Sequence, residues 1–415
     1  MSGSGKSGST TTGTAQSEGS LPCAPGQPRR APARSRLAGA ASGLPLVSLL
    51  LLTGCGNFFD LPKGTGGGGG TTPSGDYLYV ANANPSLNTI AGLSLSAGAL
   101  SATTNSPYLL GATPTALALT PDNTLLYAAS TLGGVFVYTA SSGGALTLGN
   151  GGGAVAGVTA QSLVVDPTGA WLLALQGQAT AAGPVLTVFA ITPGTGKLTT
   201  QASIGLDAGT AGQLLLAPNT TGTNFLYAML GTGGIDVLSF DTTTGSATKL
   251  ALHYGPLGTN GYSDNRAASN PAGTRLFVAE TGTNGVRSFS IGTDGSLKTL
   301  TGSPTAQGTG GSALLVDATG SFLYSADSAK STINAFSIST TGVLALLATA
   351  SYTTGTSPTD MVEDSSGGYL AVACAGGTPD LDVFPITASG ALGAPVIATT
   401  GTSSPAVAYA IAASH

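Results

Sequence analysis

The stretch TGSFLYSADSAKSTINAFSISTTGVL, Thr319 to Leu344, contains the unit from which the fold is built. An apolar run, FLYSA, is followed by a polar loop, an alternating run, TINAFSI, and a glycine turn. Alternation with a period of two is typical of a half-buried β-strand. Glycine is favoured in tight hairpin turns because it adopts positive φ readily. The stretch therefore predicts two antiparallel strands, the second of which ends in a hairpin turn.

Two markers of this unit recur in phase along the chain. Runs equivalent to LYSA are separated by 48, 46, 54, 50, 47 and 47 residues, and they begin at Leu78, Leu126, Leu172, Leu226, Leu276, Leu323 and Leu370. The glycine turns that follow them lie at Gly98, Gly144, Gly196, Gly245, Gly295, Gly342 and Gly390. Self-similarity at a fixed period indicates a repeat architecture, and both markers count seven units.

The order of strands within a unit, and the two ends of the series, predict a closed ring. An apolar strand that ends in a Pro/Asp/Gly turn precedes most LYxA runs, so each unit holds four short antiparallel strands, the content of one propeller blade. The first unit starts at its second strand, YLYVA, whereas the chain ends with an extra inner-type strand, SPAVAYAIAAS. Residues 76–415 are therefore expected to form an all-β, seven-bladed β-propeller whose terminal strands share one blade. A solenoid is the alternative, but it would need capping ends.

The composition excludes a nucleic-acid-binding surface. Charged residues make up 7% of the chain, against roughly 25% in typical soluble proteins. From Cys55 onward there are 8 Lys and Arg against 17 Asp and Glu, scattered singly. Binding to phosphates needs clustered cations, so no nucleic-acid partner is expected.

The N-terminal residues predict an export signal followed by a tether. In residues 1–54, a basic, Ser/Gly/Pro-rich segment precedes an uncharged run from Leu37 to Gly54, which suits the apolar region of a signal peptide. The run then ends in LTGC, Leu52 to Cys55, which resembles a bacterial lipobox and implies acylation of Cys55. A chance cysteine after an ordinary secretory segment is the alternative. Residues 55–75 would form the lipidated cysteine and a flexible Gly/Thr/Pro tether, and the protein is expected outside the cytoplasm, anchored to a membrane in the periplasm or at the cell surface.

The cysteine count excludes a disulfide framework. Of the three cysteines, Cys23 would be removed with the signal and Cys55 would be acylated. Cys374 would have no partner and is expected to be a small buried core residue.

The repeats resemble a known family. The quoted stretch and DYLYVANANPSLNTIAGLSLSAGAL, Asp76 to Leu100, are similar to the lactonase-type seven-bladed propellers, which include 6-phosphogluconolactonase-like and YVTN-repeat proteins. The resemblance implies His, Arg and Glu side chains around a central channel, with a histidine near the start of an inner strand. Aligning the inner strands places none of this chain's histidines there; the equivalent positions are Ala116, Ser162, Gln213, Arg266, Ala313, Asp360 and Val407.

Several polar residues remain as candidate ligand-binding groups. Gln213, Arg266 and Asp360 occupy the ring position and Glu363 lies close by, so they could bind an anionic or hydroxylated ligand at the channel mouth. A structural ion pair or solvated loop ends are the alternative for Arg266 and Asp360. His253 lies in a long insertion, ALHYGPLGTNGYSDNR, as part of a lid or as a solvated loop residue.

Three functions are compatible with these residues. The first is a lipid-anchored module that binds a carbohydrate-like or anionic small molecule, or a protein partner. The second is a hydrolase of a sugar lactone, with Arg266 binding a carboxylate or phosphate and Asp360, Glu363 or Glu280 acting as base. The third is a structural surface protein. No cofactor or metal is predicted, because the sequence has neither a His/Cys cluster with metal-ligand spacing nor a glycine run between a strand and a helix.

Replacing Cys55 with Ser tests the anchor. The variant is expected to be released in soluble form or to keep its signal uncleaved, because serine lacks the thiol that receives the lipid. Mass spectrometry of the mature N-terminus checks this. An unmodified wild-type N-terminus at a residue other than Cys55 would contradict the lipoprotein assignment.

Overall fold

The computed structural model of the chain describes residues 75–84, 88–177, 183–218, 224–257, 262–282, 285–305, 311–401 and 407–415. These residues belong to one compact unit. The predicted signal peptide, Cys55 and nearly all of the predicted tether lie outside them. Among the described residues, none forms a helix long and apolar enough to span a bilayer.

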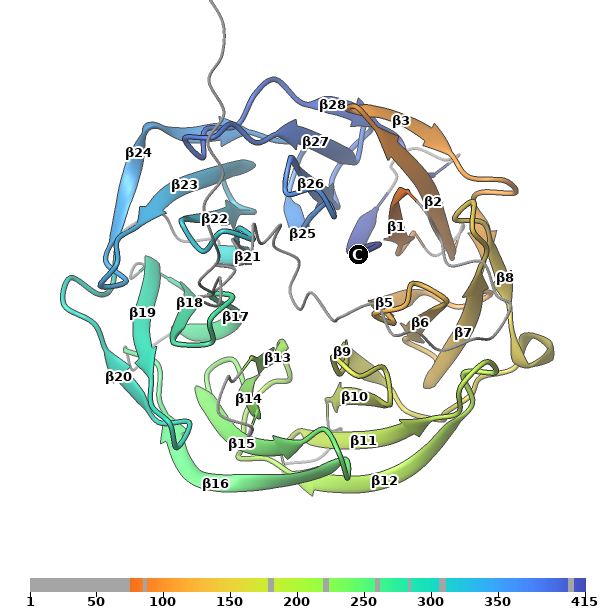
Figure 1. The fold of residues 1–415 in the computed structure, drawn as a ribbon, viewed down its shortest axis with the longest axis horizontal. Coiled ribbons are helices and arrows are strands. Elements are labelled where there is room, and N and C mark those ends of the chain that lie inside the picture. Colours follow the sequence, from red (N-terminus) through yellow and green to blue (C-terminus); the bar gives the residue numbers. More distant parts are fainter. Residues whose placement is uncertain are drawn as a thin grey trace, which may run out of the picture. The chain divides into compact units, whose positions relative to one another are not determined.

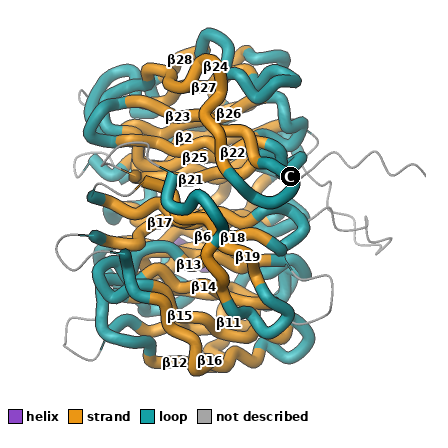
Figure 2. Tube along the Cα trace, turned by 90° about the vertical axis from the view of Figure 1, so that its left-hand side faces the viewer, coloured by secondary structure: helices purple, strands orange, loops and turns teal. Residues whose placement is uncertain are grey.

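Seven antiparallel sheets stand in a ring (Figure 1), as the repeats predict. From the edge, strands occupy the middle of the molecule, while loops and turns cover its two faces (Figure 2). The first blade contains β29 (Ala408–Ala413), β1 (Asp76–Asn82), β2 (Thr89–Ser96) and β3 (Ala99–Ala102), with β4 (Tyr108–Leu109) paired to β2. The seven-bladed architecture and the shared blade are confirmed.

The other six blades each contain four strands in chain order, counted from the channel outward. The second is β5 (Pro114–Leu119), β6 (Leu125–Ser130), β7 (Gly134–Ala140) and β8 (Leu146–Leu148). The third is β9 (Ala160–Val165), β10 (Trp171–Gln176), β11 (Val185–Ile191) and β12 (Leu198–Gly205). A short 3-10 helix, η1 (Asn150–Gly152), lies between them. The fourth is β13 (Leu214–Ala217), β14 (Asn224–Met229), β15 (Ile235–Asp241) and β16 (Ser246–Tyr254).

The last three blades repeat this order. The fifth is β17 (Ser263–Ser269), β18 (Arg275–Thr281), β19 (Gly285–Ile291) and β20 (Leu297–Thr299). The sixth is β21 (Gly311–Val316), β22 (Phe322–Asp327), β23 (Thr332–Ile338) and β24 (Leu344–Thr353). The seventh is β25 (Pro358–Glu363), β26 (Tyr369–Cys374), β27 (Leu381–Pro385) and β28 (Val396–Ala398).

The two sequence markers keep the same phase because they touch each other across blades. The tyrosine of a LYxA run is buried and its hydroxyl donates to the carbonyl of the next blade's turn glycine, as from Tyr324 to Gly390 at 2.9 Å. The same bond forms in the pairs Tyr79 and Gly144, Tyr127 and Gly196, and Tyr227 and Gly295. The residue two positions before the tyrosine covers the same glycine: a Cβ added to Gly390 would lie 2.2 Å from Phe322. The glycine is thus required both by its φ of 75° and by the close approach of the neighbouring blade.

The core lies between blades, where apolar faces of adjacent sheets meet. Cys374 is free and wholly buried there, as the sequence predicts. The ring is closed by antiparallel pairing of β1 with β29, in which Leu78 lies opposite Ala413 and Val80 opposite Ile411. Ser414 extends the closure, since its Oγ accepts the Tyr77 N–H at 2.8 Å.

Deleting Pro405 to His415 tests this closure. The truncation removes β29 and leaves the inner edge of β1 without its partner, so the truncated protein is expected to unfold at a lower temperature and to aggregate through the exposed edge. Differential scanning calorimetry and size-exclusion chromatography check the result. A monomeric truncated chain with an unchanged melting temperature would contradict the closure.

Candidate functional site

The inner strands β5, β9, β13, β17, β21, β25 and β29 lie nearest the centre of the ring (Figure 1). Residues of all of them except β21 line a cavity there, which we call the channel. In six blades a β-bulge interrupts the pairing of the inner strand with its neighbour, as between Asp264 and Arg266 or between Pro358 and Asp360. A bulge reorients the residue that follows it. The bulges therefore define one equivalent position at the start of the inner strand in these six blades, and in the fourth blade Gln213 directly precedes β13.

The structure brings three of the predicted site residues to one cavity. Gln213, Arg266 and Asp360 line a channel cavity of about 360 Å³, together with Ser162 and a wall of alanine and leucine side chains. The position assigned to Val407 is wrong: Ala410 lies opposite Ala81 and lines the cavity instead. Pairing of the closing strand begins at Ala408, so Val407 precedes the paired residues and cannot be the residue that follows the bulge.

The polar residues of this ring connect consecutive inner strands. Gln213 Oε1 accepts the N–H of Ala267 at 2.7 Å, and Arg266 Nε donates to the carbonyl of Ser312 at 2.9 Å. Ser162 Oγ accepts the N–H of Leu214 at 3.1 Å. These side chains therefore hold neighbouring blades together at the channel wall, whatever else they bind.

Asp360 is the acidic group of the cavity. Its Oδ1 accepts the Met361 N–H at 3.0 Å and its Oδ2 the Ile411 N–H at 3.1 Å. Burial raises the pKa of this carboxyl, while the positive charge of Arg266 and the two N–H donors act in the opposite direction. Arg266 and Asp360 share the cavity without forming a direct ion pair, so the ion-pair alternative does not apply.

Two side chains that sequence reasoning missed also line the cavity. Tyr409 lies in β29, and His415 lies toward the end of the channel where Pro121 and Pro167 lie. The His415 backbone is fixed by Asn123, whose side chain exchanges hydrogen bonds of 2.9 and 2.8 Å with it. Counting residues along the closing strand would have placed both near the channel.

Glu363 lies outside the cavity. Val362 faces the channel, and Glu363, on the other face of β25, reaches the turn of the preceding blade, where its Oε2 accepts the N–H of Ala318 at 2.8 Å. Burial raises the pKa of Glu363 to about 8, although this hydrogen bond opposes the shift. Glu363 therefore joins two blades.

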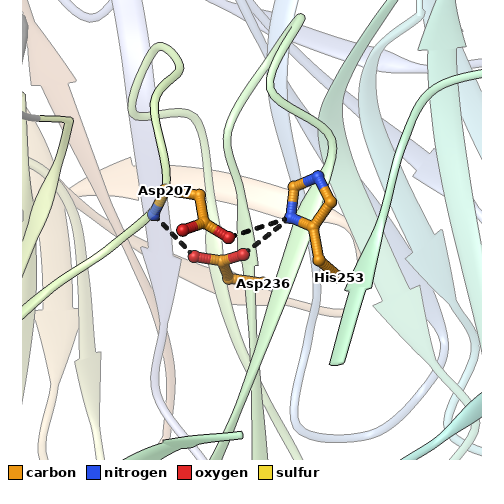
Figure 3. Close-up of side chains that lie close together, drawn as sticks. All are labelled: Asp207, Asp236 and His253. Atoms are coloured by element: carbon orange, nitrogen blue, oxygen red, sulfur yellow. Dashed lines mark hydrogen bonds and ion pairs between the residues drawn. The ribbon is translucent and has the colours of Figure 1, made fainter. Parts of the chain in front are cut away.

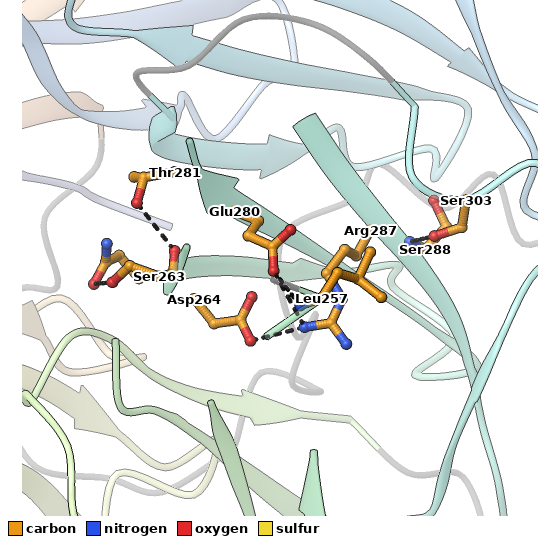
Figure 4. Close-up of polar contacts among 9 residues, drawn as sticks. Leu257, Ser263, Asp264, Glu280, Thr281, Arg287, Ser288 and Ser303 are labelled. Atoms are coloured by element: carbon orange, nitrogen blue, oxygen red, sulfur yellow. Dashed lines mark hydrogen bonds and ion pairs between the residues drawn. The ribbon is translucent and has the colours of Figure 1, made fainter. Parts of the chain in front are cut away.

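Glu280 belongs to a buried charge cluster at the ends of β17 and β18 (Figure 4). Its Oε1 accepts the Leu257 N–H at 2.6 Å and lies 3.9 Å from Arg287 Nη1, which pairs with Asp264 Oδ2 at 2.8 Å. Burial raises the pKa of Asp264 to about 6, against the influence of Arg287. Glu280 does not line the channel cavity.

His253 lies in β16, the outermost strand of its blade, and not in the loop that the sequence indicates. Strand β16 extends further than the pattern suggests, because the residues up to Tyr254 pair with β15. His253 contacts Asp236 and Asp207 at the edge of the propeller, so it is not a lid over the cavity.

Comparisons with known proteins agree with this arrangement. Residues 93–394 match the family model described as lactonase, 7-bladed beta-propeller. No curated protein matches the chain in sequence. Among solved structures, the periplasmic gluconolactonase of Pseudomonas aeruginosa is 16% identical, with a TM-score of 0.64 over 82% of this chain and 99% of that one. A Bacteroides uniformis protein proposed to be a 6-phosphogluconolactonase is 16% identical, with a TM-score of 0.64 over 81% of this chain and 98% of that one. At this identity the likeness concerns the fold.

Replacing Glu363 with Gln tests the burial of this carboxyl. The unfolded group loses its proton near pH 4.5 whereas the folded group keeps it to about pH 8, so the folded state binds more protons between these values and the free energy of unfolding falls as the pH rises. The amide cannot ionise, so the variant is expected to lose part of this decline, about 1–3 kcal/mol at pH 8 after allowance for solvent screening. Urea unfolding at pH 5 and pH 8 measures it. Asp122→Asn, on an exposed turn, is the control, and an unchanged slope in Glu363→Gln would contradict the assignment.

Proposed function

Because the chain belongs to the family of lactonase seven-bladed β-propellers, we propose that its channel cavity binds a small anionic, hydroxylated molecule of the sugar-acid type. The observation that carries this proposal is the convergence of Gln213, Arg266 and Asp360, from three different inner strands, on one cavity. Its volume of about 360 Å³ is in the range of small-molecule sites, which combine apolar walls with a few polar groups.

The hydrogen bonds already formed leave suitable groups for a ligand. Arg266 uses Nε for Ser312 and makes a long contact of 3.5 Å from Nη1 to the Asn265 carbonyl. Among the described residues, neither Arg266 Nη2 nor Gln213 Nε2 has a hydrogen-bond partner. A guanidinium is well suited to a carboxylate or phosphate, and the Asp360 carboxylate can accept from hydroxyl groups. The cavity thus offers complementary groups for an acid that carries hydroxyls.

Binding is favoured over rapid hydrolysis by the environment of the only cavity carboxylate among the described residues. Both Asp360 oxygens accept backbone N–H groups, which hold the carboxylate in place and act against the rise in its pKa that burial causes. His415 lies away from the ring position, and His253 lies on an outer strand. A well-placed general base contributes 10²–10⁴-fold to a rate, and no side chain at the ring position is arranged in that way.

Lactone hydrolysis is the second candidate. Burial raises the pKa of Asp360 toward that of a working base, and Arg266 lies in the same cavity to bind a substrate carboxylate or phosphate. Glu363 and Glu280 lie outside this cavity, so Asp360 is the base this mechanism would use.

We also propose that the propeller is held at a membrane outside the cytoplasm by a lipid on Cys55. Support comes from the uncharged run that precedes LTGC in the sequence and from the periplasmic location named for the similar Pseudomonas aeruginosa protein. The glycine-rich segment after Cys55 would then separate the ring from the membrane.

Arg266→Ala tests the binding function. The variant is expected to bind gluconate or 6-phosphogluconate with about 1.5–3 kcal/mol less free energy than the wild type, the range for a hydrogen bond to a charged group. Titration calorimetry measures this, with Lys197→Ala, an exposed cation outside the cavity, as the charge-matched control. Hydrolysis of glucono-δ-lactone should stay close to the spontaneous rate. Robust turnover that Arg266→Ala or Asp360→Asn abolishes would instead establish the hydrolase.

A further inference from the structure

A second group of polar side chains lies at the rim of the fourth blade, away from the channel. Asp236 is in β15, Lys249 and His253 are in β16, and Asp207 follows β12 of the preceding blade. We call these four residues the rim cluster. Asp236 and His253 are cross-strand partners, so the pairing of β15 with β16 fixes their separation.

The ligand atoms of three of these residues converge (Figure 3). His253 Nδ1 lies 2.8 Å from Asp236 Oδ1 and 3.4 Å from Asp207 Oδ2. One ligand atom from each of the three residues lies within 4.8 Å of the other two. The imidazole nitrogen therefore faces a pair of carboxylate oxygens from two different segments.

The remaining carboxylate oxygens are held by other donors. Lys249 Nζ lies 2.5 Å from Asp207 Oδ1 and 3.2 Å from Asp236 Oδ2, and the Asp207 N–H donates to Asp236 Oδ2 at 2.8 Å. In each carboxylate, one oxygen therefore contacts Lys249 and the other oxygen faces His253. Such outer contacts orient metal ligands in proteins.

Burial and charge favour a cation between the three ligand atoms. The Asp236 side chain is 0% exposed, whereas those of Asp207 and His253 are 49% and 41% exposed and leave an open side for an ion to enter. Two aspartates face a single lysine in the rim cluster, and a divalent ion would compensate this excess of acidic side chains.

The observed spacing is close to that of a tetrahedral metal site. Bonds of about 2.1 Å from zinc to nitrogen and oxygen, at tetrahedral angles, separate neighbouring ligand atoms by about 3.4 Å. The distance from His253 Nδ1 to Asp207 Oδ2 already has this value, 3.4 Å. The distance from His253 Nδ1 to Asp236 Oδ1 is 2.8 Å, the length of a hydrogen bond. It would have to increase by about 0.6 Å for both atoms to bind the same ion.

We propose that the rim cluster is a binding site for a divalent transition-metal ion of the zinc class. His253 Nδ1, Asp207 Oδ2 and Asp236 Oδ1 are the protein ligands, water completes the coordination on the open side, and Lys249 orients the two carboxylates. When the ion binds, the ring proton is carried by Nε2, and the Nδ1 lone pair is available to the metal. It ties the segment after β12 to the outer strands of the next blade, and this role is independent of ligand binding in the channel.

Zinc itself is the probe. The purified full chain is stripped with EDTA and titrated with Zn²⁺ by calorimetry, and Co²⁺ is added separately to detect the visible absorption of a tetrahedral site. One ion per chain is expected in this site. His253→Ala and Asp207→Asn, both at partly exposed positions, are each expected to weaken binding at least 10-fold, since even outer contacts of metal sites contribute that much.

The matched control is His415→Ala, because the chain has only two histidines. It is expected to leave zinc affinity and the cobalt spectrum unchanged, and melting curves confirm that each variant is folded. The proposal is overturned if the wild type binds no zinc, or if His253→Ala and Asp207→Asn bind as tightly as the wild type. The second result would place the ion elsewhere, for example on the cysteines.

Discussion

The contact between a buried aromatic side chain and the turn glycine of the next blade is the interaction on which the ring depends. At four of these contacts a tyrosine hydroxyl donates to the glycine carbonyl while a neighbouring bulky side chain, such as Phe322 over Gly390, covers the space that a Cβ would occupy. Trp171 covers Gly245 in the same way, without a tyrosine hydrogen bond to that glycine. Glycine is required in the turn for its positive φ. It is also required because a Cβ would clash with the side chain of the neighbouring blade that covers the turn. One residue type therefore sets both the hairpin within a blade and the spacing between blades.

The polar residues of the channel also have two roles. Gln213, Arg266 and Asp360 each form a hydrogen bond to the inner strand of the following blade, so they stabilise the wall that they line. A ligand in this cavity would meet side chains whose positions are already fixed, which reduces the entropy lost on binding. The same fixation restricts the movement that a base would need during turnover, and this restriction favours recognition over catalysis.

Charge is scarce in this protein, and much of it is used in contacts between segments. With 7% charged residues, the structure still gathers Asp264, Glu280 and Arg287 in one buried cluster and Asp207, Asp236, Lys249 and His253 in another. Both clusters lie where loops between blades meet strand ends. A buried charge is tolerated only when it is paired. The first cluster joins three strands of the fifth blade, and the second joins the segment after β12 to the fourth blade.

The sequence by itself determined the number of blades, their strand order and the closure by β1 and β29, because period-two alternation and turn glycines act locally and repeat. It also identified Gln213, Arg266 and Asp360 as channel residues, since the start of the inner strand recurs at the same point of each repeat. Only the tertiary structure decided the rest. Glu363 and Glu280 turn away from the cavity, Ala410 takes the place assigned to Val407, and His253 meets Asp207 across a blade boundary. Packing partners distant in the chain decide which face of a strand points to the channel, where strand pairing begins and which residues meet between blades. Local sequence patterns therefore do not predict these features.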